Sequence, residues 1–451
     1  MRLGAGLLCL GFMLTLSGSA VAQEKKEEPK RPPNVVVIFA DDLGYGDLGC
    51  FGHPTIKTPN LDRMASEGLR LTQFYVAECV CTPSRAGLLT GRLPIRNGMC
   101  SDTRRVLFGD SLGGLQAEEV TIAESLKAKD YATACIGKWH LGHLPQFLPT
   151  KQGFDSYYGI PYSNDMKPTV LLRGANVVED PVDQTTLTAR YTAEAVGFIR
   201  QNRDRPFFLY LPHNFPHVPL FASEKFKGKS RRGLYGDVVE ELDASVGEVL
   251  ETIRELDLAD NTLVIFTSDN GPWLTRNLEG GSAGLLRGGK GSTWEGGMRE
   301  PTIAWWPGTI PPGGVSSELG CTTDLLATIC AIVEVPLPAD RTLDSLDLRP
   351  VLLGTGESPR KSLLYYRGRQ LMAARLGPWK AHFQTQDGYG QPKPELHDPP
   401  LLFHLEHDPS ERFDVAKDHA DVIVEVRKLV AEHEAGLVAP PSQLELRTER
   451  K

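Results

Sequence analysis

Short apolar runs of strand length alternate with longer amphipathic stretches along the first three quarters of the chain. The run at 34–39 is rich in β-branched residues, which predicts a strand buried on both faces. Between 236 and 257, apolar residues recur at helical spacing and predict a long helix. Further strands are predicted at 131–137, 206–211, 261–267 and 301–306, and further helices at 58–68, 121–129 and 187–202. This alternation predicts an α/β fold with a large, mostly parallel sheet that helices cover on both faces.

From about residue 358 the pattern changes to short strands that follow one another without long helices. These strands are predicted at 362–367, 371–376, 379–385 and 401–404, and a final helix is predicted at 419–435. The pattern indicates a small antiparallel sheet with one helix. We therefore expect a large domain at 34–357, an α+β subdomain at 358–440 and a tail at 441–451.

The N-terminus has the features of a secretory signal peptide at 1–22. Arg2 supplies the positive start, an apolar run covers 7–16, and Ala20-Val21-Ala22 forms a small-residue cleavage site. The alternative is an uncleaved anchor, although the apolar run is short for a membrane span. The charged, proline-rich segment at 23–33 cannot pack into a core and predicts a disordered tether.

Composition narrows the function classes only modestly. The chain has 451 residues, of which 41% are hydrophobic and 24% charged, as in ordinary soluble proteins. A net charge of −8 argues against a general nucleic-acid binder, but it leaves room for a local cationic pocket. The basic stretch at 225–232 is either a solvated loop or a contact for a polyanion.

Eight cysteines are present, and Cys9 lies within the predicted signal peptide. Export permits disulfides, but their pairing cannot be predicted from the sequence. Cys135, inside an apolar strand, is expected to be a buried free thiol. The remaining candidates for pairing are Cys50, Cys79, Cys100, Cys321 and Cys330.

Two acidic pairs directly follow predicted strands. Asp41 and Asp42 come after the strand at 34–39, and Asp269 and Asn270 come after the strand at 261–267. Either pair alone is equally well explained as a helix cap or a turn. Together at one sheet edge, three carboxylates would repel one another without a cation, and their hard oxygens suit Ca²⁺ or Mg²⁺.

Candidate cations and histidines also stand in loops after strands. Lys138 and His140 lie in a glycine-flanked loop, and Lys290 lies between two glycines, where the backbone can approach a ligand closely. A single lysine in a loop is more often a solvated surface residue. His213 and His217 follow the strand at 206–211, and we favour His217 because of its Pro-His-Val-Pro context. Ligands gather at the carboxyl ends of strands in open α/β sheets, so these clusters are expected to converge.

The most informative motif is Cys-Thr-Pro-Ser-Arg at 81–85, followed by Thr-Gly-Arg at 90–92. Pro83 suits the first residue of a helix, so the Cys81 side chain is expected at the positive end of that helix, where an anion is favoured. The motif resembles the signature of type I sulfatases. In that family the cysteine is oxidised to formylglycine, whose hydrated aldehyde is the nucleophile. The resemblance extends from about residue 34 to about residue 414, with arylsulfatase A and N-acetylgalactosamine-6-sulfatase as the nearest patterns.

The resemblance implies an alkaline-phosphatase-like fold and a specific set of site residues. It implies that the modified Cys81 and the two acidic pairs hold Ca²⁺, with Mg²⁺ as the weaker choice. It assigns the remaining roles as follows: Arg85 binds the formylglycine region, His140 orients the hydrate, Lys138, Lys290 and Ser163 contact sulfate, and His217 is the candidate general acid. Arg276, near Asp269 in the sequence, is an additional candidate cation that the resemblance does not assign. Arg85 is alternatively explained by a salt bridge to Asp41 or Asp42.

The resemblance also implies a partner, a substrate class and a location. The domain at 34–357 would be catalytic, and a formylglycine-generating enzyme would act during maturation. The expected substrate is a sulfate ester, first of all a sulfated carbohydrate, with aryl sulfates as surrogates. No nucleic-acid partner or stable membrane insertion is expected, and a homo-oligomer stays open. The chain has no Asn-x-Ser/Thr acceptor, which favours a periplasmic or extracellular location over a lysosomal one.

Two other functions remain compatible with these residues. A phosphatase or phosphonate monoester hydrolase of the same superfamily would use a similar metal, cation and nucleophile set. A non-catalytic protein that binds sulfated glycans would need no modified cysteine. The state of residue 81 and the comparison of aryl sulfate with aryl phosphate distinguish these cases.

Overall fold

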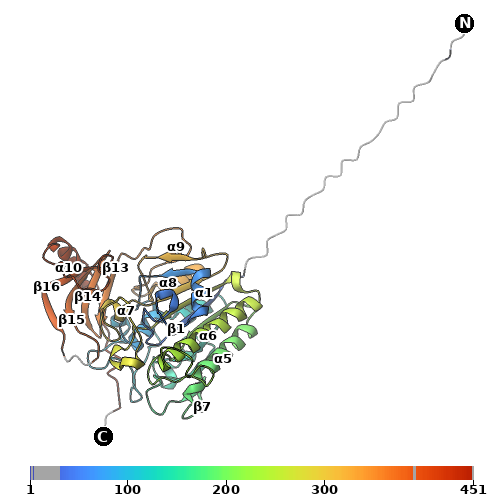
Figure 1. The fold of residues 1–451 in the computed structure, drawn as a ribbon, viewed down its shortest axis with the longest axis horizontal. Coiled ribbons are helices and arrows are strands. Elements are labelled where there is room, and N and C mark those ends of the chain that lie inside the picture. Colours follow the sequence, from blue (N-terminus) through green and yellow to red (C-terminus); the bar gives the residue numbers. More distant parts are fainter. Residues whose placement is uncertain (2–3, 5–30, 390–392, 449–451) are drawn as a thin grey trace. The chain divides into compact units, whose positions relative to one another are not determined.

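A ten-stranded sheet forms the centre of the unit Pro32–Lys451 (Figure 1). The computed structural model describes residues 1, 4, 31–389 and 393–448. The strands are, in spatial order, β11 (Gly314–Ser316), β2 (Leu69–Leu71), β10 (Thr302–Trp305), β9 (Thr262–Ser268), β1 (Asn34–Ala40), β8 (Phe207–Pro212), β4 (Ala132–Ile136), β5 (Ser156–Gly159), β6 (Leu171–Arg173) and β7 (Asn176–Glu179). A separate two-stranded ladder pairs β3 (Phe74–Tyr75) with β12 (Gly320–Cys321).

The five central strands β9, β1, β8, β4 and β5 are parallel, as the alternating pattern predicts. The sheet becomes mixed towards its edges, because β10 runs antiparallel to both β9 and β2, and β6 and β7 are also antiparallel. The predicted strand at 301–306 is therefore present as β10, but it is reversed. The segment 269–301 between β9 and β10 contains the short helices η6 (Leu274–Glu279) and α7 (Glu295–Met298) but no long crossover helix of the kind that joins parallel strands.

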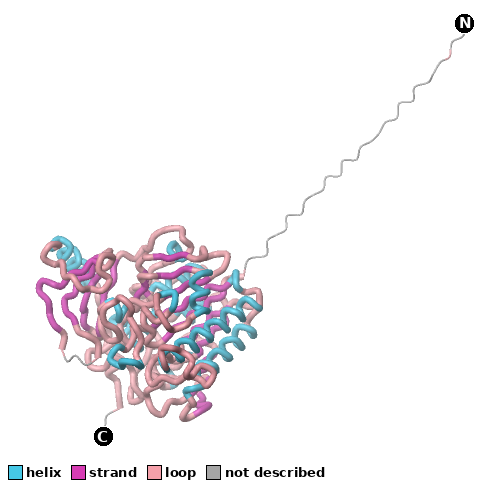
Figure 2. Tube along the Cα trace, viewed as in Figure 1, coloured by secondary structure: helices cyan, strands magenta, loops and turns pink. Residues whose placement is uncertain are grey.

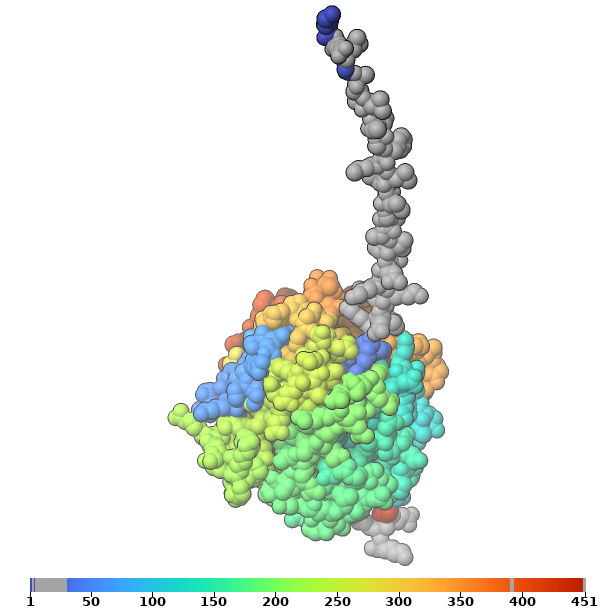
Figure 3. All heavy atoms as spheres, turned by 90° about the vertical axis from the view of Figure 1, so that its right-hand side faces the viewer, coloured from blue at the N-terminus to red at the C-terminus, as the bar shows by residue number. Residues whose placement is uncertain are grey.

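Helices cover both faces of the large sheet. Alternate residues of β1 face opposite sides, so that Val36 and Ile38 join one apolar cluster and Val35 and Val37 join the other. The first cluster contains α1 (Pro59–Glu67), α5 (Leu187–Gln201) and α6 (Leu234–Glu255). Figure 3 shows α5 and α6 within the green to yellow-green face of the molecule. The second cluster contains α2 (Cys81–Thr90), α4 (Ile122–Lys127), α8 (Asp324–Ile332) and α9 (Arg349–Leu352).

Short helices occupy the connecting loops. The α-helical ones are α3 (Pro94–Asn97) and α7 (Glu295–Met298). The 3₁₀ helices are η1 (Gly49–Phe51), η2 (Pro145–Phe147), η3 (Pro149–Lys151), η4 (Gln184–Thr186), η5 (Ala259–Asn261) and η6 (Leu274–Glu279).

The C-terminal part forms its own four-stranded antiparallel sheet with one helix, as predicted (Figure 2). Its elements are β13 (Ser362–Arg367), β14 (Gln370–Leu376), β15 (Trp379–Thr385), β16 (Glu395–His404) and α10 (Ala420–Ala435). The last strand begins six residues before the predicted range of 401–404 and passes through Pro399 and Pro400. It can do so because β16 is an edge strand and its pairing with β15 is interrupted by a register shift between Leu396 and Leu401, so neither proline has to donate to the ladder.

Some predictions concern residues that the structure does not describe. The predicted signal peptide, apart from residues 1 and 4, and most of the predicted tether at 23–33 lie outside the described residues. Within the described part of the chain, no helix combines the length and the hydropathy that a bilayer span requires. The seven cysteines from Cys50 to Cys330 are free, and Cys135 is fully buried, as expected.

A buried charge network joins the small sheet to α7. The ammonium of Lys380 on β15 lies 2.9 Å from Glu295 Oε1 and 3.0 Å from Glu411 Oε1, and all three side chains are buried. Burial raises the pKa of Glu295, but the charges of Lys380 and Arg299 outweigh this effect and bring the pKa down to about 2. Glu295 is therefore ionised and part of a buried ion-pair network.

Replacing Glu295 by Gln is expected to lower the free energy of unfolding by about 3 kcal/mol at neutral pH, because Lys380 loses one of its two buried carboxylate partners. The pKa of about 2 lies below the unfolded value of 4.5, so this stabilisation is complete above a pH of about 4.5 and is lost as the pH falls towards 2. Chemical unfolding of the parent and the variant should show a difference that shrinks across this range. A difference that stays constant with pH would contradict the assigned charge state.

Candidate active site

The acidic pairs meet at the carboxyl edge of the central strands. Asp41 and Asp42 follow β1, and Asp269 and Asn270 follow the adjacent strand β9. The backbone N–H of Asp42 donates to Asp269 Oδ1 at 3.2 Å, and Asn270 Nδ2 donates to Asp42 Oδ1 at 2.8 Å. All four side chains are almost completely buried. The residues joined by these two bonds are 227 and 228 positions apart in the sequence. The structure thus brings two distant acidic pairs together.

Cys81 points into this acidic cluster from the first residue of α2. Its Sγ lies 3.5 Å from Asp41 Oδ1 and 3.4 Å from Lys290 Nζ. The helix begins at Cys81, with Val80 as its N-cap, and not at Pro83 as we expected. Pro83 fits within the first turn because the N–H groups there have no partner inside the helix. The cysteine therefore lies at the positive end of the helix, as predicted.

Each carboxylate of the cluster has a buried cationic partner. Lys138 Nζ bonds Asp41 Oδ2, and Lys290 Nζ lies 2.7 Å from Asp42 Oδ1. Arg85 donates to Asp269 Oδ2 from Nη2 at 2.7 Å and from Nε at 3.0 Å. The main partner of Arg85 is therefore Asp269, and Asp41 is more distant at 3.7 Å. Pairing offsets part of the desolvation cost of these buried charges, and removal of one partner would leave the other uncompensated.

The pKa values of the three carboxyl groups are driven apart. Burial raises the pKa of Asp41, but Lys138 and the other nearby positive groups outweigh it and bring the value well below the ordinary one. Burial raises the pKa of Asp42, against the opposing charge of Lys290. Burial and the charge of Asp41 raise the pKa of Asp269 to about 7. Such a spread of carboxyl pKa values is typical of a functional site.

Cys81 itself is a poor nucleophile as an ordinary thiol. Burial raises the pKa of its thiol well above the usual value, although Lys138 and Lys290 act in the opposite direction. The thiol is therefore protonated at neutral pH, and the reactive thiolate is scarce. The surroundings suit a residue whose reactivity does not depend on losing a thiol proton.

Two histidines lie beside Cys81 in different hydrogen-bonding states. His217 Nδ1 bonds the carbonyl oxygen of Val218, which only accepts, so Nδ1 carries the proton. Asn164 Oδ1 also accepts from this atom at 3.0 Å, which leaves Nε2 of His217 facing Asp42 Oδ2 at 3.8 Å. His140 bonds the carbonyl oxygen of Leu107 through Nε2 at 2.9 Å. Burial, reinforced by nearby lysines, lowers the pKa of both rings well below the ordinary value.

His213 takes no part in this cluster. Its Nε2 lies 3.4 Å from Ser245 Oγ on α6, and its ring lies beside Tyr191 on α5. Burial lowers its pKa to about 3. The preference for His217 over His213 therefore agrees with the geometry.

A cavity of about 280 Å³ opens onto Cys81, His140, Ser163, His217 and Lys290. Ser163 Oγ accepts a hydrogen bond from Lys138 Nζ at 3.3 Å. The cavity is also lined by several residues that the sequence did not single out: Arg104, Arg105, Val106, Phe108, Met166, Trp273 and Tyr389.

The rings of Trp273 and Tyr389 form an aromatic wall of this cavity, with their centroids 5.0 Å apart. Trp273 follows Asn270 closely in sequence and could have been selected on that ground. Tyr389 comes from the C-terminal part, and no local signal connects it to the site. Arg276 lies over the Trp273 ring at 4.2 Å and does not line the cavity. The basic stretch at 225–232 also lies outside the cavity lining.

The carboxylate and amide oxygens of this cluster suit a hard divalent cation. Ligand atoms of Asp41, Asp42, Cys81 and His217 all lie within 4.8 Å of one another. Two oxygen ligands of one Ca²⁺ can be separated by up to about 5 Å, since each binds at roughly 2.3–2.6 Å. Asn270 Oδ1 is buried without a hydrogen-bond partner in the described structure, although its amide nitrogen donates two hydrogen bonds. An unpartnered amide oxygen beside carboxylates is what a metal ligand would look like before binding.

Comparisons with known proteins agree with one another. A family model described as Sulfatase matches residues 33–335, and one described as the C-terminal region of aryl-sulfatase matches residues 358–450. Arylsulfatase A of Homo sapiens is 46% identical across an alignment that covers 92% of this chain and 90% of that protein. N-acetylgalactosamine-6-sulfatase of Canis lupus familiaris is 42% identical across an alignment that covers 96% of this chain and 92% of that protein. The crystal structure of the PsFucS1 sulfatase from Pseudoalteromonas sp. superposes with a TM-score of 0.81 at 31% identity. The match covers 93% of this chain and 92% of that chain.

Proposed function

The chain belongs to the sulfatase family and is an enzyme that hydrolyses sulfate esters, and we propose that its substrates are sulfated carbohydrates and that it acts through formylglycine at residue 81 and a bound Ca²⁺. The observation that carries this proposal is the position of Cys81, 3.5 Å from Asp41 and 3.4 Å from Lys290 at the head of α2. The family uses formylglycine and a divalent metal, and the cluster fits both. A formylglycine hydrate would supply the attacking hydroxyl, and the cation would offset negative charge on the sulfuryl oxygens.

The metal-ligand set that we propose is Asp41, Asp42, Asp269 and Asn270 together with the modified residue 81. Ca²⁺ suits this set better than Mg²⁺, because Ca²⁺ accepts many protein oxygens in irregular geometry, whereas Mg²⁺ keeps several waters in a strict octahedron. With the carboxylate charge offset, Lys138 and Lys290 become available to bind sulfuryl oxygens. The bond between Lys138 Nζ and Ser163 Oγ supports a contact of Ser163 with the same group.

Arg85, His140 and His217 complete the proposed machinery. Arg85 fixes Asp269 and also donates to the carbonyl oxygen of Lys138 at 3.1 Å, so it joins α2 to the loops after β9 and β4. His140 lies beside residue 81 in the cavity, with Nδ1 unpartnered in the described structure, and would orient the hydrate. His217 Nε2 is the titrating atom, and an anionic ester beside it would favour its protonated form. It can then donate a proton to the leaving oxygen.

Replacing His217 by Asn is expected to slow hydrolysis of a sugar or alkyl sulfate by about 10²-fold or more, because a poor leaving group needs a proton. A nitrophenyl sulfate has a good leaving group and should lose less than about tenfold. The kcat values of the parent and the variant on both substrates measure this difference. His213→Asn is the matched control, since it removes a buried histidine outside the cluster, and it should affect both substrates equally. If the His217 variant lost the same factor in kcat on both substrates, His217 could not be the general acid.

The proposed substrate class is tested by comparing sulfated saccharides, aryl sulfate and aryl phosphate with one preparation of enzyme. The cavity wall of Trp273 and Tyr389 offers apolar rings to a sugar or aryl face, while the polar cluster receives the sulfate. We expect a higher kcat/KM on a sulfated amino sugar than on aryl sulfate, and only weak hydrolysis of aryl phosphate. Preference for the phosphate would favour the phosphatase alternative instead.

The proposed setting is outside the cytoplasm. It rests on the signal-like sequence at 1–22 and on the absence of Asn-x-Ser/Thr acceptors, which favours a periplasmic or extracellular enzyme. A formylglycine-generating enzyme is the partner that this proposal requires during maturation. Fractionation of the native host, with detection of the protein and its N-terminal residue, tests both the location and the cleavage.

A further inference from the structure

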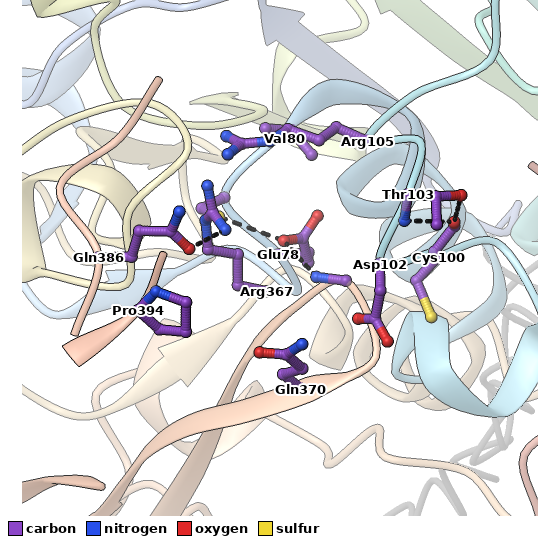
Figure 4. A pocket seen from close by; sticks show the side chains of 13 residues that line it. Glu78, Val80, Cys100, Asp102, Thr103, Arg105, Arg367, Gln370, Gln386 and Pro394 are labelled. Atoms are coloured by element: carbon purple, nitrogen blue, oxygen red, sulfur yellow. Dashed lines mark hydrogen bonds between the residues drawn. The ribbon is translucent and has the colours of Figure 1, made fainter. Parts of the chain in front are cut away.

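A second cavity, of about 270 Å³, lies beside the segment that leads into α2 (Figure 4). Glu78, Cys79 and Val80, the three residues before Cys81, all line it. Thr103 and Arg105 line both cavities. The two cavities are therefore neighbours, with Thr103 and Arg105 at their common boundary.

Three polar atoms around this second cavity lack hydrogen-bond partners. Glu78 is only 1% exposed, and its Oε1 accepts from Cys79 Sγ at 3.2 Å and from the backbone N–H of Gly368 at 3.4 Å. In the described structure Glu78 Oε2, Arg105 Nη1 and Arg367 Nη2 are buried and have no partner. Figure 4 shows Glu78 between Arg367 and Asp102, with Arg105 extending across the same cavity. Leaving a buried polar group without a partner destabilises a fold, so three such groups at one cavity are better explained by a ligand than by chance.

The other contacts of the two arginines hold them in place. Arg367 Nε donates to the carbonyl oxygen of Gly291 at 2.8 Å, and its Nη1 donates to Gln386 Oε1. The guanidinium of Arg105 lies over the ring of Tyr389, 4.5 Å from its centroid. Both side chains are thus positioned by neighbours of the catalytic cavity, and each still has an unpartnered Nη group that can donate to a ligand.

The chemistry of these groups suits a sugar with an anionic substituent. Guanidinium N–H groups match carboxylate or sulfate oxygens, and a carboxyl oxygen accepts from a hydroxyl. We propose that this cavity is a second subsite, which binds the sugar unit next to the one that is desulfated through an anionic group on Arg105 and Arg367 and a hydroxyl on Glu78. This inference rests on the proposed carbohydrate substrate.

Acidic groups do not cancel the two guanidinium charges. Burial raises the pKa of Glu78 to about 7, so this carboxyl is partly protonated near neutral pH. Asp102 also lines the cavity, but it is exposed to solvent, and its Oδ1 accepts the backbone N–H of Arg369 at 2.9 Å. A solvated carboxylate is screened, so Arg105 and Arg367 keep a local excess of positive charge.

Three disaccharides test this second subsite, all with the same scissile sulfate and with a neighbouring sugar that is neutral, carboxylated or sulfated. For the parent enzyme, kcat/KM should be about tenfold or more higher on at least one anionic substrate than on the neutral one. In Arg367→Gln this ratio should fall close to unity. A preference for only one of the two anions supports the subsite and identifies its ligand.

The ratio is measured within each variant, so a general loss of activity does not affect it. Arg369→Gln is the matched control, because Arg369 does not line the cavity and donates to the carbonyl oxygen of Pro440 at 3.0 Å. It should keep the parental preference. If Arg367→Gln does not fold, the same ratio of kcat/KM values is measured in Arg105→Gln and should also fall close to unity.

Equal kcat/KM values on all three disaccharides in the parent enzyme would overturn the second subsite and leave the carbohydrate substrate standing. A preference that persists in Arg367→Gln and in Arg105→Gln would also overturn it. Hydrolysis of aryl sulfate without hydrolysis of any disaccharide would instead reject the carbohydrate substrate, and the subsite with it.

Discussion

Replacing Cys81 by Ser is expected to reduce steady-state turnover by about 10⁴-fold or more, the scale seen when a nucleophile is removed. Serine places a hydroxyl at the head of α2 but cannot form an aldehyde. If that hydroxyl attacks sulfur, the product is a serine sulfate ester that only water can cleave. The second hydroxyl of a formylglycine hydrate, by contrast, can be deprotonated so that the residue collapses to the aldehyde and expels sulfate. The measurements are kcat on aryl sulfate and the mass of the protein after incubation with substrate.

The mass measurement shows whether the Cys81→Ser variant has lost the attack on sulfur or only the release of sulfate. An intact mass that increases by one SO₃ group would show that the first step survives and only release is lost. Cys81→Ala serves as the control, because it has no nucleophilic atom and should neither turn over nor gain mass. Since Cys81 is buried and has only long contacts to Asp41 and Lys290, both variants should fold normally. Full turnover in either variant would be incompatible with a nucleophile derived from residue 81.

Replacing Asp41 by Asn is expected to remove the bound metal and to lower kcat/KM by about 10³-fold or more. Asp41 is ionised well below its ordinary pKa, and it lies against Lys138, Arg85 and Cys81 at the end of β1. A neutral amide leaves a buried lysine without its carboxylate, which should cost about 3 kcal/mol of folding stability or more. Elemental analysis, unfolding and kinetics should therefore all change together, and the metal found in the parent should be calcium.

Asp47→Asn is the matched control for this prediction. Asp47 is also a fully buried carboxyl, but it accepts from Tyr235 Oη at 2.6 Å and from the backbone N–H groups of Gly44 and Ser282. Its replacement should destabilise the fold and leave the metal content unchanged. Normal metal content and activity in Asp41→Asn would refute the proposed ligand set, whatever the control does.

The sequence predicted the centre of the molecule well because the central strands are short, continuously apolar and followed at once by polar clusters. A strand such as β1 is buried on both faces, so its signal does not depend on distant parts of the chain. The parallel order of β9, β1, β8 and β4 then carries four separated loops to one edge. That is why the sequence alone predicts that Asp41, Asp269, Lys138 and His217 lie together.

The edges of the sheet and the walls of the cavity were less accessible to prediction. The direction of β10 depends on how the loop at 269–301 packs, and a strand pattern has no direction. The alternative explanation of Arg85 was a salt bridge to Asp41 or Asp42. Arg85 does lie 3.7 Å from Asp41, but Asp269 is nearer at 2.7 Å, because side-chain reach across a cluster is not encoded in spacing. Tyr389 and Arg367 reach the cavities from the C-terminal part through tertiary packing alone.

The most direct test is the mass of the tryptic peptide 71–85 from active protein purified from its native host, after alkylation of thiols. This peptide contains both Cys79 and Cys81, so Cys79 reports that alkylation was complete. We predict a single alkylated thiol at position 79 and an aldehyde at position 81, in a fraction of the protein that matches its active-site content. Two alkylated thiols in fully active enzyme would contradict the central claim that an oxidised residue 81 is the nucleophile.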